Sequence, residues 1–127
     1  MKQDTNNPYD LEERTAVFGE RVLVFCKSLQ YDVVSKPLVS QITRSATSVG
    51  ANCMEANGDS SKKDFRNKIF ICKKEIQETK HWLRMLSVCF PDKKDIIRDL
   101  WKECHELNLI FQSIASKLTP KESLKVG

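Results

Sequence analysis

A Glu78-x-x-His81 pair is the first pattern in this 127-residue chain that could carry chemistry. Helical bundles that hold two metal ions take such a pair from each of two helices and a Glu from each of the other two. The chain contains two His and no second pair of this kind. On a helical wheel His81 falls on the side opposite the apolar residues of its segment. His105 cannot face the same point as its neighbour Cys104, which disfavours a zinc site. We therefore expect no metal and no other cofactor.

Patterns for nucleophilic catalysis and phosphate binding are also missing. The four Gly are isolated and no G-K-[ST] sequence occurs, so there is no phosphate-binding loop. Ser45 and Ser48 have no His at a suggestive position. The five Cys contain no C-x-x-C pair, and we interpret them as reduced core thiols. The sequence thus predicts a protein that is not an enzyme.

A basic stripe in the segment 61–90 is the second pattern. This segment has eight basic and three acidic residues, whereas the rest of the chain sums to about −1. On a helical wheel the basic residues gather on one flank, with Lys63 and Lys74 at its edge. The stripe spans about 33 Å at 1.5 Å per residue, enough to follow several phosphates. The alternative is a lysine-rich face that only keeps the helix hydrated. The candidate nucleic-acid-binding residues are Lys62, Arg66, Lys73, Lys74, Lys80 and Arg84.

The opposite flank of this segment is acidic and carries a second apolar stripe. Asp64, Glu75 and Glu78 lie on this flank. The second apolar stripe, which is separate from the core seam, consists of Ile71, Trp82, Met85 and Cys89. Two apolar stripes on one helix suggest contacts with both its own bundle and a second subunit. Alternatively, Trp82 covers the edge of the bundle.

Four segments whose apolar residues recur every three or four positions must place these side chains. The spacing predicts helices at about 10–29, 37–57, 61–89 and 92–118, with a flexible tail at 119–127. Pro37 suits a first turn, Ser61 with Asp64 resembles a capping box, and Asp92 can cap the last helix. Short connections favour an all-α, antiparallel up-down-up-down four-helix bundle as a single domain over residues 1–127.

The second of these helices is lined by small and polar residues. They are Ser45, Ala46, Thr47, Ser48, Gly50, Ala51 and Asn52. Such a surface lets a neighbouring helix approach closely. Two alternatives are an interface between subunits and a small-ligand site, the latter requiring a polar cavity beside Ser45, Ser48 and Asn52.

The run Arg44-Ser-Ala-Thr-Ser-Val-Gly-Ala-Asn52 resembles a known family. So do Glu55-Ala56, Asp64-Phe65, Lys74-Glu75 and Trp82-Leu83. The likeness extends from about Leu11 to Leu118 and is to the four-helix bundle proteins encoded in intervening sequences of bacterial 23S rRNA genes, also labelled S23 ribosomal protein. Cys53-Met54 replaces a more ordinary aliphatic or aromatic pair and puts no motif in doubt.

This resemblance implies a homopentamer without known catalytic activity. The family is also similar to the accessory variability determinant of diversity-generating retroelements, a basic pentameric bundle that binds nucleic acid and a reverse transcriptase. By matching position, the structural or interface residues are Arg44, Asn52, Glu55, Glu75 and Trp82, and Glu78 is added to this set as a candidate partner of Arg44. Because a buried guanidinium without an acidic partner is costly, we expect Arg44 to pair with Glu55, Glu75 or Glu78.

The leading hypothesis is an oligomeric protein that binds RNA or DNA without sequence preference, through backbone charge. The rival is an interaction scaffold that docks a reverse transcriptase or another nucleic-acid enzyme and does not itself bind nucleic acid. No apolar run approaches the roughly 20 residues that cross a bilayer, and the start of the chain is polar, so we expect a cytoplasmic protein.

Overall fold

Four long helices make up the computed structural model, which describes residues 8–58 and 61–119. They are α1 (Pro8–Lys27), α2 (Lys36–Gly58), α3 (Lys62–Cys89) and α4 (Lys94–Leu118), and the short 3-10 helix η1 (Pro91–Lys93) precedes α4. The part of the chain that is described contains no strand. The four predicted helices are confirmed, with α1 placed two residues earlier than expected and α4 beginning two residues later. The predicted tail lies outside the described residues from position 120 onward.

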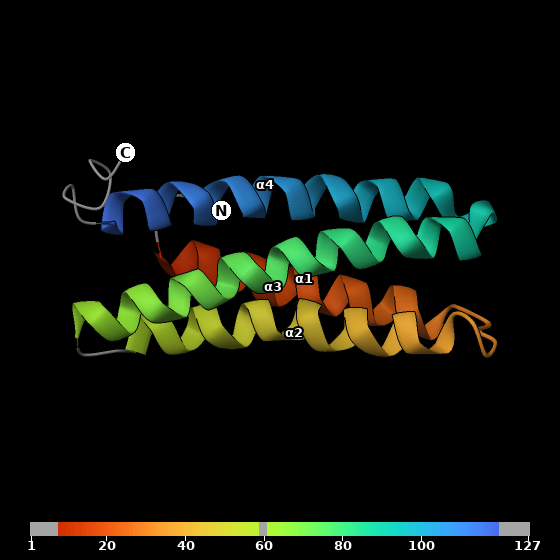
Figure 1. Cartoon of the computed structure of the whole chain (residues 1–127), viewed down its shortest axis with the longest axis horizontal. Helices are drawn as coiled ribbons and strands as arrows, with labels where there is room; N and C mark the ends of the chain where they lie inside the picture. Colours follow the sequence, from red (N-terminus) through yellow and green to blue (C-terminus); the bar gives the residue numbers. More distant parts are fainter. Residues whose placement is uncertain (1–7, 59–60, 120–127) are drawn as a thin grey trace, which may run out of the picture.

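The helices run alternately up and down and pack in chain order (Figure 1). The helix α3 lies between α2 and α4, while α1 lies behind α3 in this view and packs mainly on α2. The helix α4 contacts α3 extensively and α1 only sparsely. The fold is therefore the predicted all-α four-helix bundle, with its most open seam between α1 and α4.

Local hydrogen bonds fix where α2 and α3 begin. The Ser61 hydroxyl accepts a bond of 3.0 Å from the Asp64 backbone N–H, as the capping pattern predicted. Before α2, the Asp32 carboxylate accepts bonds from the Val34 and Ser35 backbone N–H groups, which lowers the pKa of Asp32. The prediction that Asp92 caps α4 is wrong: Asp92 lies in η1, and no side-chain capping bond forms at the start of α4.

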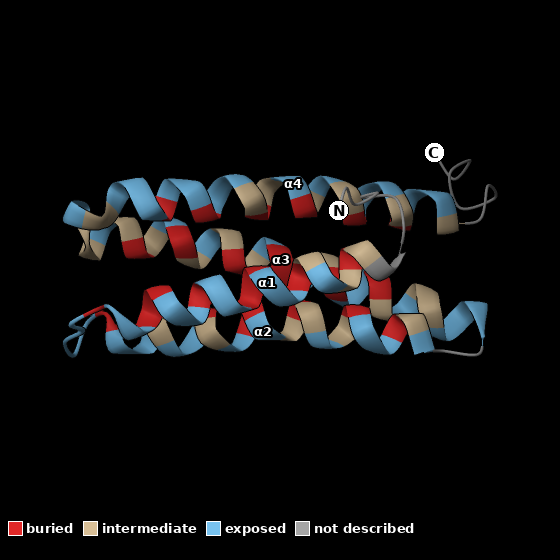
Figure 2. Cartoon of the chain, turned by 180° about the vertical axis from the view of Figure 1, so that it is seen from behind, coloured by how far each residue is buried: buried red, intermediate tan, exposed pale blue. Residues whose placement is uncertain are grey.

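One continuous core joins the apolar faces of all four helices (Figure 2). Most apolar positions that recur every three or four residues are buried, Ala115 among them, and Val39, Phe65, Ile114 and Leu118 are half-buried at the margin of the core. A seam of this length explains how residues such as Ser45 and Thr79 remain helical, since tertiary packing outweighs their modest helix propensity.

Small residues bring α1 and α2 close together, which confirms the predicted tight crossing. A Cβ atom added to Gly50 would lie 3.5 Å from the backbone of Thr15 and Ala16. One added to Gly19 would lie 3.6 Å from the Ala46 carbonyl oxygen. The backbones therefore come close enough at this crossing that a methyl group would just touch the facing helix, and a larger side chain would not fit.

All five cysteines are free thiols, and four of them are buried. Burial raises the pKa of the Cys53 thiol to about 11 and that of the Cys104 thiol to about 12. Burial also raises the pKa of the Cys72 thiol above its ordinary value. The Cys104 thiol donates to the Ile76 carbonyl oxygen at 3.3 Å. These thiols therefore stay protonated and act as small core residues, as the sequence predicted.

Candidate nucleic-acid interface

The basic stripe of α3 lies along the side of the helix that faces α4. Lys62 and Arg66 line a groove with Lys117 of α4, and Arg84 lines a second groove with Lys94 and Arg98. Between the two grooves, Lys80 is half-buried against α4. Two further stripe residues line neither groove; they are the half-buried Lys73 and the exposed Lys74.

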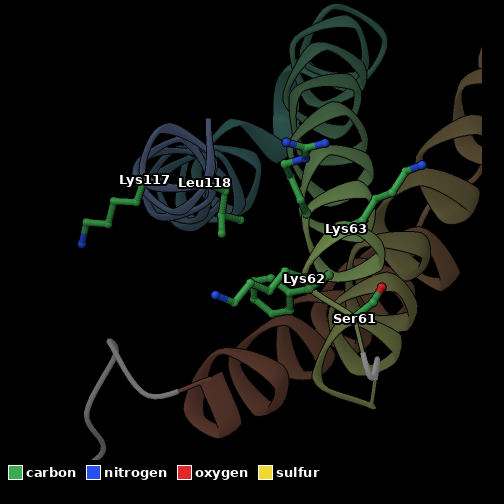
Figure 3. Close-up of a pocket in the computed structure, with 7 residues that line it drawn as sticks. Ser61, Lys62, Lys63, Lys117 and Leu118 are labelled. Atoms are coloured by element: carbon green, nitrogen blue, oxygen red, sulfur yellow. The ribbon is translucent and has the colours of Figure 1, made fainter. Parts of the chain in front are cut away.

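The first groove, at the start of α3 and the end of α4, has a volume of about 680 Å³. Among the described residues, its lining includes four cations and no carboxylate: Ser61, Lys62, Lys63, Phe65, Arg66, Lys117 and Leu118. In Figure 3 the side chains of Lys62, Lys63 and Lys117 extend in different directions. The groove therefore has a broad positive rim, which suits an extended polyanion better than one enclosed phosphate.

The second groove lies near the other end of the same seam and has a volume of about 260 Å³. Three cations and one aromatic ring stand out in its lining, which is Leu83, Arg84, Ser87, Lys94, Ile97, Arg98 and Trp101. No carboxylate of the described segments lines it.

Lys80, Trp101 and His105 form a cluster beside the second groove. The Lys80 ammonium lies 2.9 Å from Nδ1 of His105 and 4.5 Å from the centroid of the Trp101 ring. The Trp101 and His105 rings are stacked, with centroids 5.1 Å apart and planes within 5° of parallel. Because an ammonium group can only donate, Nδ1 of His105 accepts this bond. The cluster fixes both the cation and the indole ring on the surface.

The stripe cations remain without acidic partners. In the segments 8–58 and 61–119, none of the six predicted binding residues forms an ion pair with Asp or Glu. Five carboxylates on other sides of the helices pair instead with Arg14, Arg44 and Lys68. The face formed by α3 and α4 consequently keeps its positive charge.

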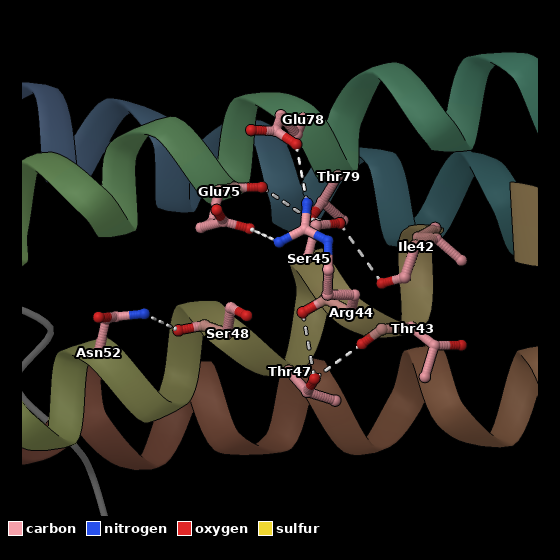
Figure 4. Close-up of polar contacts among 10 residues, drawn as sticks. All are labelled: Ile42, Thr43, Arg44, Ser45, Thr47, Ser48, Asn52, Glu75, Glu78 and Thr79. Atoms are coloured by element: carbon pink, nitrogen blue, oxygen red, sulfur yellow. Dashed lines mark hydrogen bonds and ion pairs between the residues drawn. The ribbon is translucent and has the colours of Figure 1, made fainter. Parts of the chain in front are cut away.

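Among the predicted family residues, Arg44 joins α2 to α3 through two carboxylates (Figure 4). Arg44 donates to Glu75 at 3.0 Å and to Glu78 at 2.9 Å, so the expected pairing is found. Its side chain is 49% exposed and that of Glu75 only 9%, so the buried charge is the carboxylate. The long Arg44 side chain reaches to the surface and neutralises Glu75 from outside.

The remaining family residues also bond within the bundle. Glu55 pairs with Lys68 at 2.7 Å, and the Asn52 amide donates to the Ser48 carbonyl oxygen at 2.8 Å. Trp82 is half-buried against the core, and its Nε1 is buried without a hydrogen-bond partner in the described segments. These contacts show how the residues stabilise one subunit and leave their interfacial role a prediction.

In the described segments, the His and Ser residues considered for metal binding and catalysis do not come together into a site. No group of three His, Cys, Asp or Glu in those segments could hold a metal ion. Glu78 binds Arg44, and His81 is exposed beside Trp82. Ser45 is buried and bonded to Thr79 at 2.8 Å. A groove of about 360 Å³ outside α1 and α2 is lined by Thr47 and Gly50, not by the serines predicted for a ligand site.

Sequence reasoning missed the contribution of α4 to this interface. Lys94, Arg98, Trp101 and His105 recur at intervals of four, three and four residues, so they share one helical face. That spacing was the available signal. His105 itself is half-buried under Lys80 and Trp101.

Comparison with known proteins decides the family. The model of the 23S rRNA-intervening sequence protein family matches residues 10–115. The chain belongs to this family. A similar crystal structure is that of a protein with unknown function from the S23 ribosomal protein family of Bacteroides thetaiotaomicron. It has 29% sequence identity and a TM-score of 0.74, and the match covers 83% of this chain and 97% of that one. No curated protein matches the chain.

The family consists of small helical proteins and is not a known enzyme family. Among the described helices, none combines the length and the apolar character needed to cross a bilayer.

Proposed function

We propose that this 23S rRNA-intervening sequence family protein binds nucleic acid, RNA or DNA, through the face formed by α3 and α4. The observation that carries the proposal is the row of stripe cations that lack acidic partners in the described segments. The helix α4 adds Lys94, Arg98 and Lys117 to the same face. Phosphates would replace the missing carboxylates and release counterions, which needs no base-specific contact.

Self-association would multiply this contact. The resemblance implies a homopentamer, in which the basic face is repeated around a ring. The partly exposed Ile71 and the half-buried Met85 of the second apolar stripe are our candidates for the contact between subunits.

The five free thiols of this protein suit a reducing compartment, so we propose that the protein acts in the cytoplasm.

The test is binding of the purified protein to labelled structured RNA and duplex DNA of equal length across a salt series. If about six phosphates are neutralised, affinity should fall roughly 1,000-fold between 50 and 200 mM salt. Reversing the charge of four stripe residues, Arg66, Lys73, Lys80 and Arg84, should abolish binding. The matched control reverses four exposed cations elsewhere, Arg21, Lys27, Lys36 and Lys102, with the same change in net charge. Retained binding by the stripe variant would refute the proposal.

A second candidate is a scaffold that docks a reverse transcriptase or another nucleic-acid enzyme, as the similarity to the accessory variability determinant suggests. Exposed apolar side chains on the outside of the helices favour it, notably Val24 at 71% and Val88 at 76% exposure. No nucleic-acid binding at low salt, combined with oligomers that still expose these residues to an apolar dye, would favour the scaffold.

A further inference from the structure

The second groove of the α3–α4 face presents an aromatic ring among cations. Trp101 is 37% exposed, although it lies on α4 next to the buried Leu100. Arg84, Lys94 and Arg98 share the groove with it, and the described part of the chain places no carboxylate in its lining. An exposed indole surrounded by guanidinium and ammonium groups combines two features of sites for single-stranded nucleic acid: a surface for stacking and charges for the backbone.

One side of the Trp101 ring is already occupied. The His105 ring is nearly parallel to it, and stacked rings in contact lie about 3.5 Å apart. The Lys80 ammonium bonds to His105 at 2.9 Å, so it must lie on the same side of the indole as the imidazole. On the opposite side it would be roughly twice the stacking distance from His105.

The order of residues along α4 points to the groove lying on the other side of the indole. His105 follows Trp101 along α4, whereas the groove residues of α4, Lys94, Ile97 and Arg98, precede it. Lys80 and His105 hold the ring from behind, so little side-chain freedom remains to be lost on binding. The volume of about 260 Å³ is below the roughly 300–1,000 Å³ of pockets for whole drug-sized ligands, which suits a single base.

We infer that Trp101 is a stacking platform for an unpaired base of single-stranded nucleic acid, whose adjacent phosphates contact Arg84, Lys94 and Arg98. This inference rests on the proposed function and specifies its substrate as single-stranded. The remaining stripe cations would continue the contact with the backbone toward the first groove. Bases within a duplex are stacked on their neighbours and cannot use this platform unless the duplex opens.

The experiment compares two labelled oligonucleotides of equal length, a single strand carrying bases and an abasic strand with the same phosphates. Wild-type protein should bind the base-containing strand more tightly. Trp101→Ala should weaken that binding about 5- to 150-fold, the range that corresponds to one stacked base, and should leave the abasic strand nearly unaffected. Trp101→Phe should retain part of the affinity. Val24→Ala, which removes an exposed apolar side chain from α1, is the matched control and should change neither.

A second readout does not require loss of Trp101. In a Trp82→Phe variant Trp101 is the remaining tryptophan, and the base-containing strand should quench its fluorescence while the abasic strand should not. Equal weakening of both strands by Trp101→Ala, no weakening of either, or the same dependence on Trp101 for a duplex would overturn the stacking inference and leave electrostatic binding intact. No binding of either strand at low salt would refute the proposed function and the inference with it.

Discussion

A pair of buried hydroxyl groups joins α2 to α3 and provides a test of the helix packing that positions the basic stripe of α3. Ser45 and Thr79 are fully buried, and their oxygens lie 2.8 Å apart. Thr79 also donates to the Glu75 carbonyl oxygen at 2.8 Å. Each hydroxyl has one proton, and because the Thr79 proton has this short bond we assign Ser45 as the donor to Thr79. The next acceptor for Ser45 is the Ile42 carbonyl oxygen at 3.4 Å, too distant for a strong bond.

This proton order makes the two single substitutions unequal. Ser45→Ala removes one net hydrogen bond, and Thr79 keeps its own acceptor, so we expect a loss of about 0.5–1.5 kcal/mol in the free energy of unfolding. Thr79→Val keeps the side-chain volume but leaves the buried Ser45 donor with only the distant carbonyl, which costs about 1–3 kcal/mol. The double variant removes the orphaned donor and should lose about 1 kcal/mol less than the sum.

Urea unfolding followed by circular dichroism measures all three free energies. Thr47→Val serves as the control, because its hydroxyl is exposed and bonds only within α2; its effect should stay within about 0.5 kcal/mol. Additive losses, or a larger loss for Ser45→Ala than for Thr79→Val, would refute the proton order.

Three further tests address the helix crossing and the core thiols: substitution of Gly50, a change of pH and alkylation of the cysteines. Gly50→Ala should stabilise the protein by up to about 1 kcal/mol, because the added Cβ makes only ordinary contacts at 3.5 Å. Gly50→Leu should destabilise it by about 1–3 kcal/mol, because the larger side chain does not fit between α1 and α2. Equal melting temperatures of the two variants would contradict the close crossing. The raised pKa values of Cys53 and Cys104 favour the folded state below pH 9, so the free energy of unfolding should fall as pH rises from 9 through 11 and 12. Alkylation followed by mass spectrometry should modify the partly exposed Cys89 first, and equally fast reaction of Cys53 would show that the core is open.

The fold could be predicted from the sequence because its signal is local. The three-and-four spacing marks each seam, and Pro37, Ser61 and Pro91 mark the boundaries. The Asp92 cap failed because residues 91–93 form a 3-10 turn, so α4 begins only at Lys94. Helix boundaries therefore depend on geometry finer than residue preference.

The candidate interface could be predicted only in part, because half of it depends on how two helices pair. The α3 stripe follows from one helical wheel. Its association with Lys94, Arg98 and Lys117 requires the antiparallel alignment of α3 with α4, which no wheel contains. The exposure of Arg44 was likewise hidden, because residue type does not reveal that its long side chain extends past the seam.

The sparse seam between α1 and α4 has a consequence for the order of folding. All extensive packing joins helices that follow one another in the chain, so each hairpin can form through short loops, as in helical bundles that fold within microseconds to milliseconds. Arg14 and Glu103, 89 positions apart and bonded at 2.7 Å, would meet after these hairpins have docked. A contact that forms this late slows unfolding but does not accelerate folding. Arg14→Ala should therefore raise the unfolding limb of a chevron plot, and a slower folding limb would contradict this order.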